Sequence, residues 1–148
     1  MKILIAGSSG MIGSAVAAYL ASRGHDVSRL VRQAPVAGEV HWDPDAGNID
    51  AAGLEGLDGV VHLASMPWPM RWTPKTKKQL YANRIITNSL LANTLAVCQR
   101  KPQVLVCASG MGIYPASGDQ ILTEDSPLGT DFLARLQCDG EAANGPAG

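Results

Sequence analysis

The sequence predicts an α/β protein with a doubly wound parallel sheet that stops after about five strands. Two observations predict it. Short apolar runs alternate with segments in which apolar residues recur at helical spacing, and a glycine-rich turn joins the first run to the first such segment. Strands separated by helices pair in parallel through right-handed crossovers. We expect strands at residues 3–6, 25–31, 39–42, 59–64 and 104–108.

The helix pattern is clearest after the fourth expected strand. Thr73 is a good N-cap, and Pro74 suits the first position of a helix. The apolar face of this helix is expected to consist of Ile86, Leu90, Leu91, Leu95 and Cys98. Residues 115–131 are rich in Pro, Gly, Ser and Asp and predict a loop. The tail 140–148 holds three glycines and a proline, so we expect it to be frayed.

Composition limits the class of protein. A chain of 148 residues is long enough for one α/β domain, and a net charge of −1 gives no electrostatic reason to expect nucleic acid or a membrane as a partner. No apolar run approaches the roughly 20 residues that span a bilayer. Three widely spaced cysteines are typical of reduced thiols rather than of disulfides or a metal site. These features favour a cytoplasmic protein without a bound metal.

The strongest signal is the segment 7–13, which reads G-S-S-G-M-I-G directly after the first strand and opens a helix. Such a turn places main-chain N–H groups at a helix N-terminus, where the unpaired donors and the helix dipole favour a pyrophosphate. A Cβ at Gly7 or Gly10 would obstruct the turn or that approach, and Gly13 lets the helix pack on its strand. The pattern predicts a dinucleotide site of the Rossmann fold. A tight turn without a ligand is the alternative.

The end of the second strand bears on the choice of cofactor. An NAD site usually has an Asp or Glu there for the ribose 2′-hydroxyl. This strand ends in Leu30, Val31 and Arg32, without an acid. The planar guanidinium of an arginine suits a 2′-phosphate. We therefore expect NADP in preference to NAD, unless Arg32 is an ordinary exposed loop residue.

Several stretches match a known family between Met1 and about Ala143. Besides the glycine turn, they are residues 40–44 (V-H-W-D-P), 60–64 (V-V-H-L-A), 71–72 (R-W), 83–84 (N-R), 123–127 (T-E-D-S-P) and 131–134 (D-F-L-A). On these residues the chain resembles the extended branch of the short-chain dehydrogenase/reductase superfamily. Within that branch it is similar to the atypical subgroup of NAD(P)-dependent epimerase/dehydratase-like epimerase family proteins. The glycine turn is generic to the superfamily, whereas W-D-P and D-F-L-A are more specific to the subgroup.

The resemblance implies a set of cofactor contacts and a domain that covers residues 1–148. The set, with the turn glycines included, is Gly7, Gly10, Met11, Ile12, Gly13, Val31, Arg32, Leu63, Ala64 and Arg84. Leu63 and Ala64 close the fourth strand, and ligands of open α/β sheets lie at the carboxyl ends of the strands. Arg84 has an equally strong alternative as a surface arginine paired with an acid. Asp43 either touches the adenine or caps the segment that follows it.

The catalytic pattern of the superfamily is missing. Active members use a Ser or Thr, a Tyr and a Lys four residues after that Tyr, but this chain has no Y-x-x-x-K. Phe132 and Leu136 stand where the Tyr and the Lys would be, and a phenylalanine cannot donate a proton. Ser109 and Tyr114 remain as catalytic candidates, although the position four before Tyr114 is Gly110. The resemblance implies that the subgroup itself lacks the Tyr–Lys pair.

Two departures and one expected gap belong to this chain. Ser65-Met66 stands where the subgroup has Gly-Glu, and Gly140-Glu141 stands where it has Trp-Glu. Relatives continue into further strands and a substrate lobe, which these 148 residues lack. A sheet that stops there exposes an edge and an apolar face, so we expect self-association through that surface.

Three functions remain open. The chain is either an NADP-binding oxidoreductase or sugar-nucleotide epimerase-like protein acting on a small molecule, a catalytically silent NADP-binding module, or an interaction domain without a nucleotide.

Overall fold

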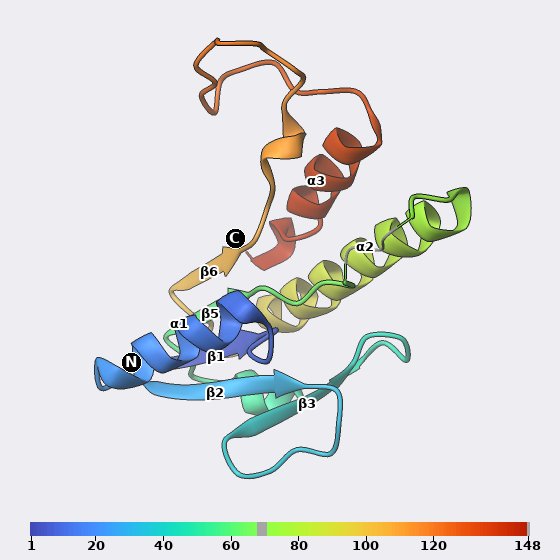
Figure 1. The fold of residues 1–148 in the computed structure, drawn as a ribbon. Helices are drawn as coiled ribbons and strands as arrows, with labels where there is room; N and C mark the ends of the chain where they lie inside the picture. The colour runs from blue at the N-terminus through green and yellow to red at the C-terminus, as the bar shows by residue number, and fades with distance from the viewer. Residues whose placement is uncertain (68–70, 148) are drawn as a thin grey trace.

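The computed structural model describes residues 1–67 and 71–147, and the sheet they form has six strands in the order β4-β3-β2-β1-β5-β6 (Figure 1). Only the pair β3 and β4 is antiparallel. The strands are β1 (Lys2–Ala6), β2 (Asp26–Val31), β3 (Glu39–Asp43), β4 (Asn48–Ile49), β5 (Gly59–His62) and β6 (Val104–Cys107). The five parallel strands confirm the predicted doubly wound α/β sheet, and the two-residue β4 is an addition that its short sequence did not indicate.

Helices lie on both faces of this sheet. They are α1 (Met11–Ser22), α2 (Pro74–Ala96) and α3 (Phe132–Ala142), with single turns η1 (Ala51–Leu54), η2 (Met111–Ile113) and η3 (Gly145–Ala147). The central strand β1 divides the core in two. Leu4 and Ala6 belong to the larger cluster with residues of α2, whereas Ile3 and Ile5 pack with Ala17 of α1. Both faces of β1 are therefore apolar, as expected for a strand covered on each side.

The long helix α2 begins as predicted and buries most of the predicted apolar face, with Ile86 as the exception. The hydroxyl of Thr73 accepts a hydrogen bond from the backbone N–H of Thr76, which confirms the N-cap. Leu91 and Leu95 are buried, and Cys98 is buried just beyond the helix end. The assignment of Ile86 to the core was wrong, because Ile86 is 43% exposed and faces a pocket at the carboxyl end of the sheet.

The prediction of a frayed tail was also wrong. Helix α3 continues through Ala142 and is followed by η3. Gly140 is buried, and Ala147 packs against the larger core cluster. The residue composition suggested disorder, but the helix is capped by Asp131, whose carboxylate accepts from the N–H of Ala134. Packing against α2 has overridden the weak helix propensity of glycine.

A buried polar link joins β5, α2 and α3. The His62 Nε2–H donates to Asn88 Oδ1 at 2.9 Å, and the Asn88 amide donates to the carbonyl of Gly140 at 2.7 Å. Because the Asn88 Nδ2 must donate to that carbonyl, its oxygen accepts from His62, and this assigns the proton of the neutral imidazole to Nε2. The ring of His62 also makes an edge contact with Trp42, with the centroids 6.1 Å apart.

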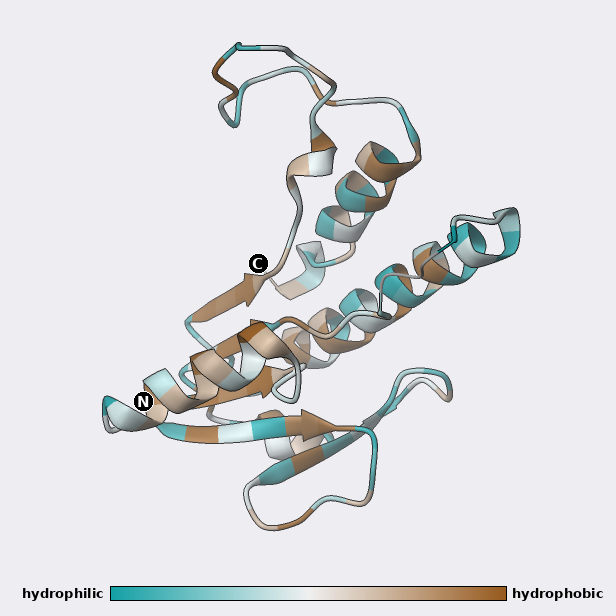
Figure 2. Ribbon diagram, in the orientation of Figure 1, coloured by the Kyte–Doolittle hydropathy of each residue, from teal (hydrophilic) through white to brown (hydrophobic). Residues whose placement is uncertain are grey.

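Strand β6 forms the far edge of the sheet. Among the described strands it pairs only with β5. Val104 and Val106 of β6 are 46% and 51% exposed. Figure 2 shows β6 as an apolar strand at the edge of the sheet. The described part of the molecule thus ends in the open apolar edge that the sequence predicts.

The buried His62 predicts a pH dependence of stability. Desolvation lowers its pKa from 6.5 to about 4, so the unfolded chain takes up this proton at a higher pH than the folded protein does. The free energy of unfolding should fall by about 3 kcal/mol as the pH falls from about 6.5 to about 4. Urea unfolding at a series of pH values measures this loss.

The variant His62→Gln keeps a donor for Asn88 but has no proton to gain, so its stability should depend less on pH in this range. The variant His25→Gln is the control, because His25 has no part in the buried link. Equal slopes for the wild type and His62→Gln would contradict the prediction.

Candidate functional site

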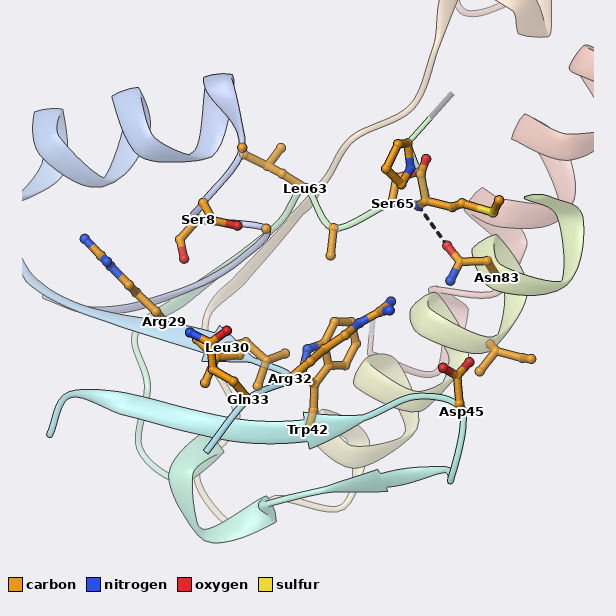
Figure 3. Close-up of a pocket in the computed structure, with 18 of the residues that line it drawn as sticks. Ser8, Arg29, Leu30, Arg32, Gln33, Trp42, Asp45, Leu63, Ser65 and Asn83 are labelled. Atoms are coloured by element: carbon orange, nitrogen blue, oxygen red, sulfur yellow. Dashed lines mark hydrogen bonds between the residues drawn. The ribbon is translucent and has the colours of Figure 1, made fainter. Parts of the chain in front are cut away.

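The pocket lies where the carboxyl ends of β1, β2 and β5 meet the side of α2, and its volume is about 890 Å³ (Figure 3). The glycine turn forms one wall, and the last residues of β2 form another. The segment after β5 and one face of α2 complete it. Open α/β sheets bind their ligands at this edge. The volume is within the range of about 300–1,000 Å³ that is usual for small-molecule sites.

The three glycines of the turn have different roles. Gly7 has a φ of +84°, and a Cβ there would lie 2.7 Å from the backbone nitrogen of Ala64. A Cβ at Gly13 would overlap the carbonyl oxygen of Gly7, so α1 can approach β1 this closely only without one. A Cβ at Gly10 would meet only the carbonyl oxygen of Gly7, at 3.4 Å. The fold thus requires Gly7 and Gly13, whereas Gly10 leaves open space at the pocket.

The N-terminus of α1 carries no cap of its own. Its N-cap residue is Gly10, which provides no side-chain hydrogen bond, and its first turn contains no acidic residue. Met11 and Ile12, predicted to contact a cofactor, are 86% and 61% exposed at this end of the helix. Their side chains do not line the pocket, and neither does Gly13.

Two arginines of β2 and its end line the pocket. Figure 3 shows Arg32 pointing from the end of β2 toward α2, while Arg29 lies at the other end of the pocket. Val31 also lines the pocket, and Gln33 follows Arg32 without an acid. This side of the pocket thus holds two arginines, together with Glu39 of β3, which pairs in register with Arg29.

The segment after β5 is held against α2. Leu63 and Ala64, which were predicted to contact a cofactor, line the pocket. The backbone N–H of Met66 donates to Asn83 Oδ1 at 2.9 Å, and this bond joins the segment to the pocket face of α2 (Figure 3). Asn83 was part of a recognised motif but was not predicted as a site residue. Its position at the pocket depends on the rotation of α2, which the sequence pattern does not define.

Two further residues differ from their expected places. The carboxylate of Asp43 accepts from the backbone N–H groups of Asp45 and Ala46, which confirms its capping alternative, and Asp45 lines the pocket instead.

Arg84 does not line the pocket. Its Nη2 donates to the carbonyl of Ala108 and to Gln137 Oε1. Burial lowers the pKa of Arg84, while nearby Cys107 and Glu141 oppose that shift. Arg84 is half-buried among these groups, so it is not a surface arginine.

The two catalytic candidates lie beyond β6. The hydroxyl of Ser109 donates to the carboxylate of Glu141 on α3, a partner that the sequence did not indicate. Tyr114 follows the turn η2 and is half-buried. Phe132 begins α3 and meets the ring of Trp72 edge-on, with the centroids 5.7 Å apart, and the ammonium of Lys77 lies 5.1 Å from the Phe132 ring. Leu136 is buried.

Some site types have no counterpart in the described structure. In residues 1–67 and 71–147 no three His, Cys, Asp or Glu side chains are grouped closely enough to hold a metal ion. Over the same ranges, every helix is too short or too polar to cross a bilayer.

Comparison with known proteins identifies the wider context. The model of the NAD dependent epimerase/dehydratase family matches residues 3–133. An epimerase family protein of Mycobacterium bovis is 39% identical over 147 residues, which are 98% of this chain and 48% of that protein. The human epimerase family protein SDR39U1 is 34% identical over 97% of this chain and 48% of its own length. The chain thus spans about half the length of these relatives.

Solved structures agree with the fold. The crystal structure of human SDR39U1 with NADPH superimposes with a TM-score of 0.85 at 32% identity, over 97% of this chain and 48% of that one. A nucleoside-diphosphate sugar epimerase from Corynebacterium glutamicum gives a TM-score of 0.86 at 36% identity, over 99% of this chain and 31% of that one. These matches confirm the resemblance that was noted from the sequence.

Proposed function

The chain belongs to the NAD dependent epimerase/dehydratase family, and we propose that it binds NADP. We further propose that it acts on a small molecule as an oxidoreductase or epimerase-like protein of the extended short-chain dehydrogenase/reductase type. The observation that carries the proposal is the cradle at the start of α1. There the open side of Gly10 and the uncapped helix end face a pocket of suitable size. We expect this protein in the cytoplasm, because its three cysteines are all free thiols.

The diphosphate of the cofactor would be held by the main-chain N–H groups at the start of α1. These donors have no side chain to cap them, and the helix dipole adds a partial positive charge. A Cβ at Gly10 would occupy part of the space that the diphosphate needs. The proposed binding set is Gly7, Gly10, Met11, Ile12, Gly13, Val31, Arg32, Leu63, Ala64 and Arg84, of which Arg84 would have to leave its bonds to Ala108 and Gln137.

Arg32 is the reason for proposing NADP. It lines the pocket at the end of β2, where a ribose 2′-hydroxyl or 2′-phosphate would lie. A guanidinium binds a phosphate dianion through two parallel hydrogen bonds, whereas it has no matching partner in a 2′-hydroxyl. The NADPH complex of human SDR39U1 supports the same choice by similarity.

A catalytically silent NADP-binding module is the second candidate. It is favoured by one observation: Phe132 packs with Trp72 and Lys77, and Leu136 is buried, so the usual Tyr–Lys pair has no substitute at its own positions on α3. Such a module would bind the cofactor without transferring hydride. An interaction domain without a nucleotide would bind neither cofactor.

We also propose that two copies of the chain associate through the β6 edge. The exposed Val104 and Val106 and the unpaired side of β6 form a surface that monomeric proteins usually cover. A second copy can cover it by adding its own β6 to the sheet.

The cofactor preference depends on Arg32. Replacing Arg32 with Ala should weaken NADPH binding about 10- to 100-fold, the equivalent of 1.5–3 kcal/mol for a charged hydrogen-bonded pair, and should leave NADH binding nearly unchanged. Titration of each cofactor followed by nicotinamide fluorescence measures both constants. Arg23→Ala, which removes a cation that lies over Tyr19, is the matched control. An unchanged ratio of the two constants would remove the basis for choosing NADP.

Association through β6 predicts a concentration-dependent dimer. Sedimentation equilibrium should show a dimer of the wild type and a monomer of Val106→Lys, because a charge on the apolar edge opposes pairing. Val36→Lys is the control, since Val36 is exposed in the loop between β2 and β3. A wild type that stays monomeric at high concentration would refute this proposal.

A further inference from the structure

The sheet register places Ser109 just beyond β6, the strand that neighbours β5. His62 pairs with Cys107 at the end of the β5–β6 ladder, and the N–H of Ala108 continues the ladder by donating to the carbonyl of His62. Two residues beyond His62 is Ala64, which lines the pocket, and two residues beyond Cys107 is Ser109, which does not itself line it. Neighbouring parallel strands lie about 4.8 Å apart, so the chain at Ser109 leaves the sheet at the same edge as the pocket wall.

The hydroxyl of Ser109 is held by a carboxylate from a different element. It donates to Glu141, which lies in the last turn of α3. Ser109 and Glu141 are both exposed, so a proton that reaches Glu141 can leave to solvent. A serine hydroxyl that donates to a carboxylate has its oxygen lone pairs free to accept a proton from a third group. As it accepts that proton, it can pass its own proton to the carboxylate.

Two glycines allow α3 to bring Glu141 to this position. A Cβ at Gly140 would lie 3.0 Å from both Cγ and Nε of Arg84, and a Cβ at Gly110 would lie 2.7 Å from Nε2 of Gln137. Asn88 then holds the carbonyl of Gly140. The side chain of Gln137 therefore occupies the space that a side chain at position 110 would fill. The superfamily pattern has its serine at this position.

Arg84 is positioned behind the pair. Its Nη2 donates to the carbonyl of Ala108, the residue before Ser109, and its charge interacts with that of Glu141.

We propose that Ser109 and Glu141 form a proton relay, at the carboxyl end of β6, that replaces the missing Tyr–Lys pair. The inference rests on the proposed function, because the relay needs a bound nicotinamide dinucleotide. When the carbon of a secondary alcohol gives hydride to the oxidised nicotinamide, the alcohol oxygen gives its proton to Ser109 Oγ. The original hydroxyl proton of Ser109 passes to Glu141. The alcohol becomes a ketone, the nicotinamide is reduced, and Glu141 releases the proton to solvent.

The test measures NADP⁺ reduction by a panel of secondary alcohols that includes UDP-glucose, UDP-glucuronic acid and cyclohexanol. With an alcohol that the wild type oxidises, Glu141→Gln and Ser109→Ala should each lower kcat by about 100-fold or more, which is typical for loss of a general base. Glu141→Asp, which retains a carboxylate, should lose less of kcat than Glu141→Gln, a difference that a purely structural role would not cause. Asp139→Asn, which neutralises a neighbouring carboxylate on α3, should retain kcat.

Binding measurements separate the two levels of the argument. NADPH should bind Glu141→Gln as tightly as it binds the wild type, and thermal unfolding verifies that each variant is folded. A wild type that binds no NADPH would refute the proposed function. Two outcomes would refute the relay alone. In the first, the wild type binds NADPH but transfers hydride from no alcohol in the panel. In the second, Glu141→Gln binds NADPH and turns over as fast as the wild type.

Discussion

The close approach between the start of α1 and the carboxyl end of β1 is the constraint on which the structure depends. Gly7 lies against the backbone at Ala64, and Gly13 lies against the carbonyl of Gly7, with no room for a Cβ at either place. This contact seats α1 with its N-terminal N–H groups at the edge of the sheet where β2 and β5 also end. The pocket exists because these three strand ends and α2 surround that helix end.

The periodic parts of the fold could be predicted because each is encoded locally. The apolar run at residues 3–6 indicates a strand covered on both faces, and Thr73 with Pro74 begins a helix through a local side-chain cap and a fixed backbone angle. Ile86 was misplaced because helical spacing identifies an apolar face but not what that face contacts. The tail was misjudged because Gly140 serves close packing of α3 against Arg84 rather than chain flexibility.

The same distinction applies to the site. The glycine turn and Arg32 were visible because a short motif and one strand end define their positions. Asn83 and Glu141 were not, because each comes to the site through the packing of a helix that is distant in sequence. The one signal that was available for Glu141 was the replacement of the subgroup's Trp-Glu by Gly-Glu, since a glycine at that position permits contact with Arg84.

The most direct test of the account is a two-dimensional NMR spectrum of the ¹⁵N-labelled protein during titration with NADPH. If the diphosphate binds at the start of α1, the largest shifts should occur at the amide signals of Ser9, Gly10, Met11 and Ile12, with smaller shifts at Ala64 and Arg32. Shifts confined to the open β6 edge, or unchanged signals from the four turn amides at saturating NADPH, would contradict the central claim that these amides hold the cofactor.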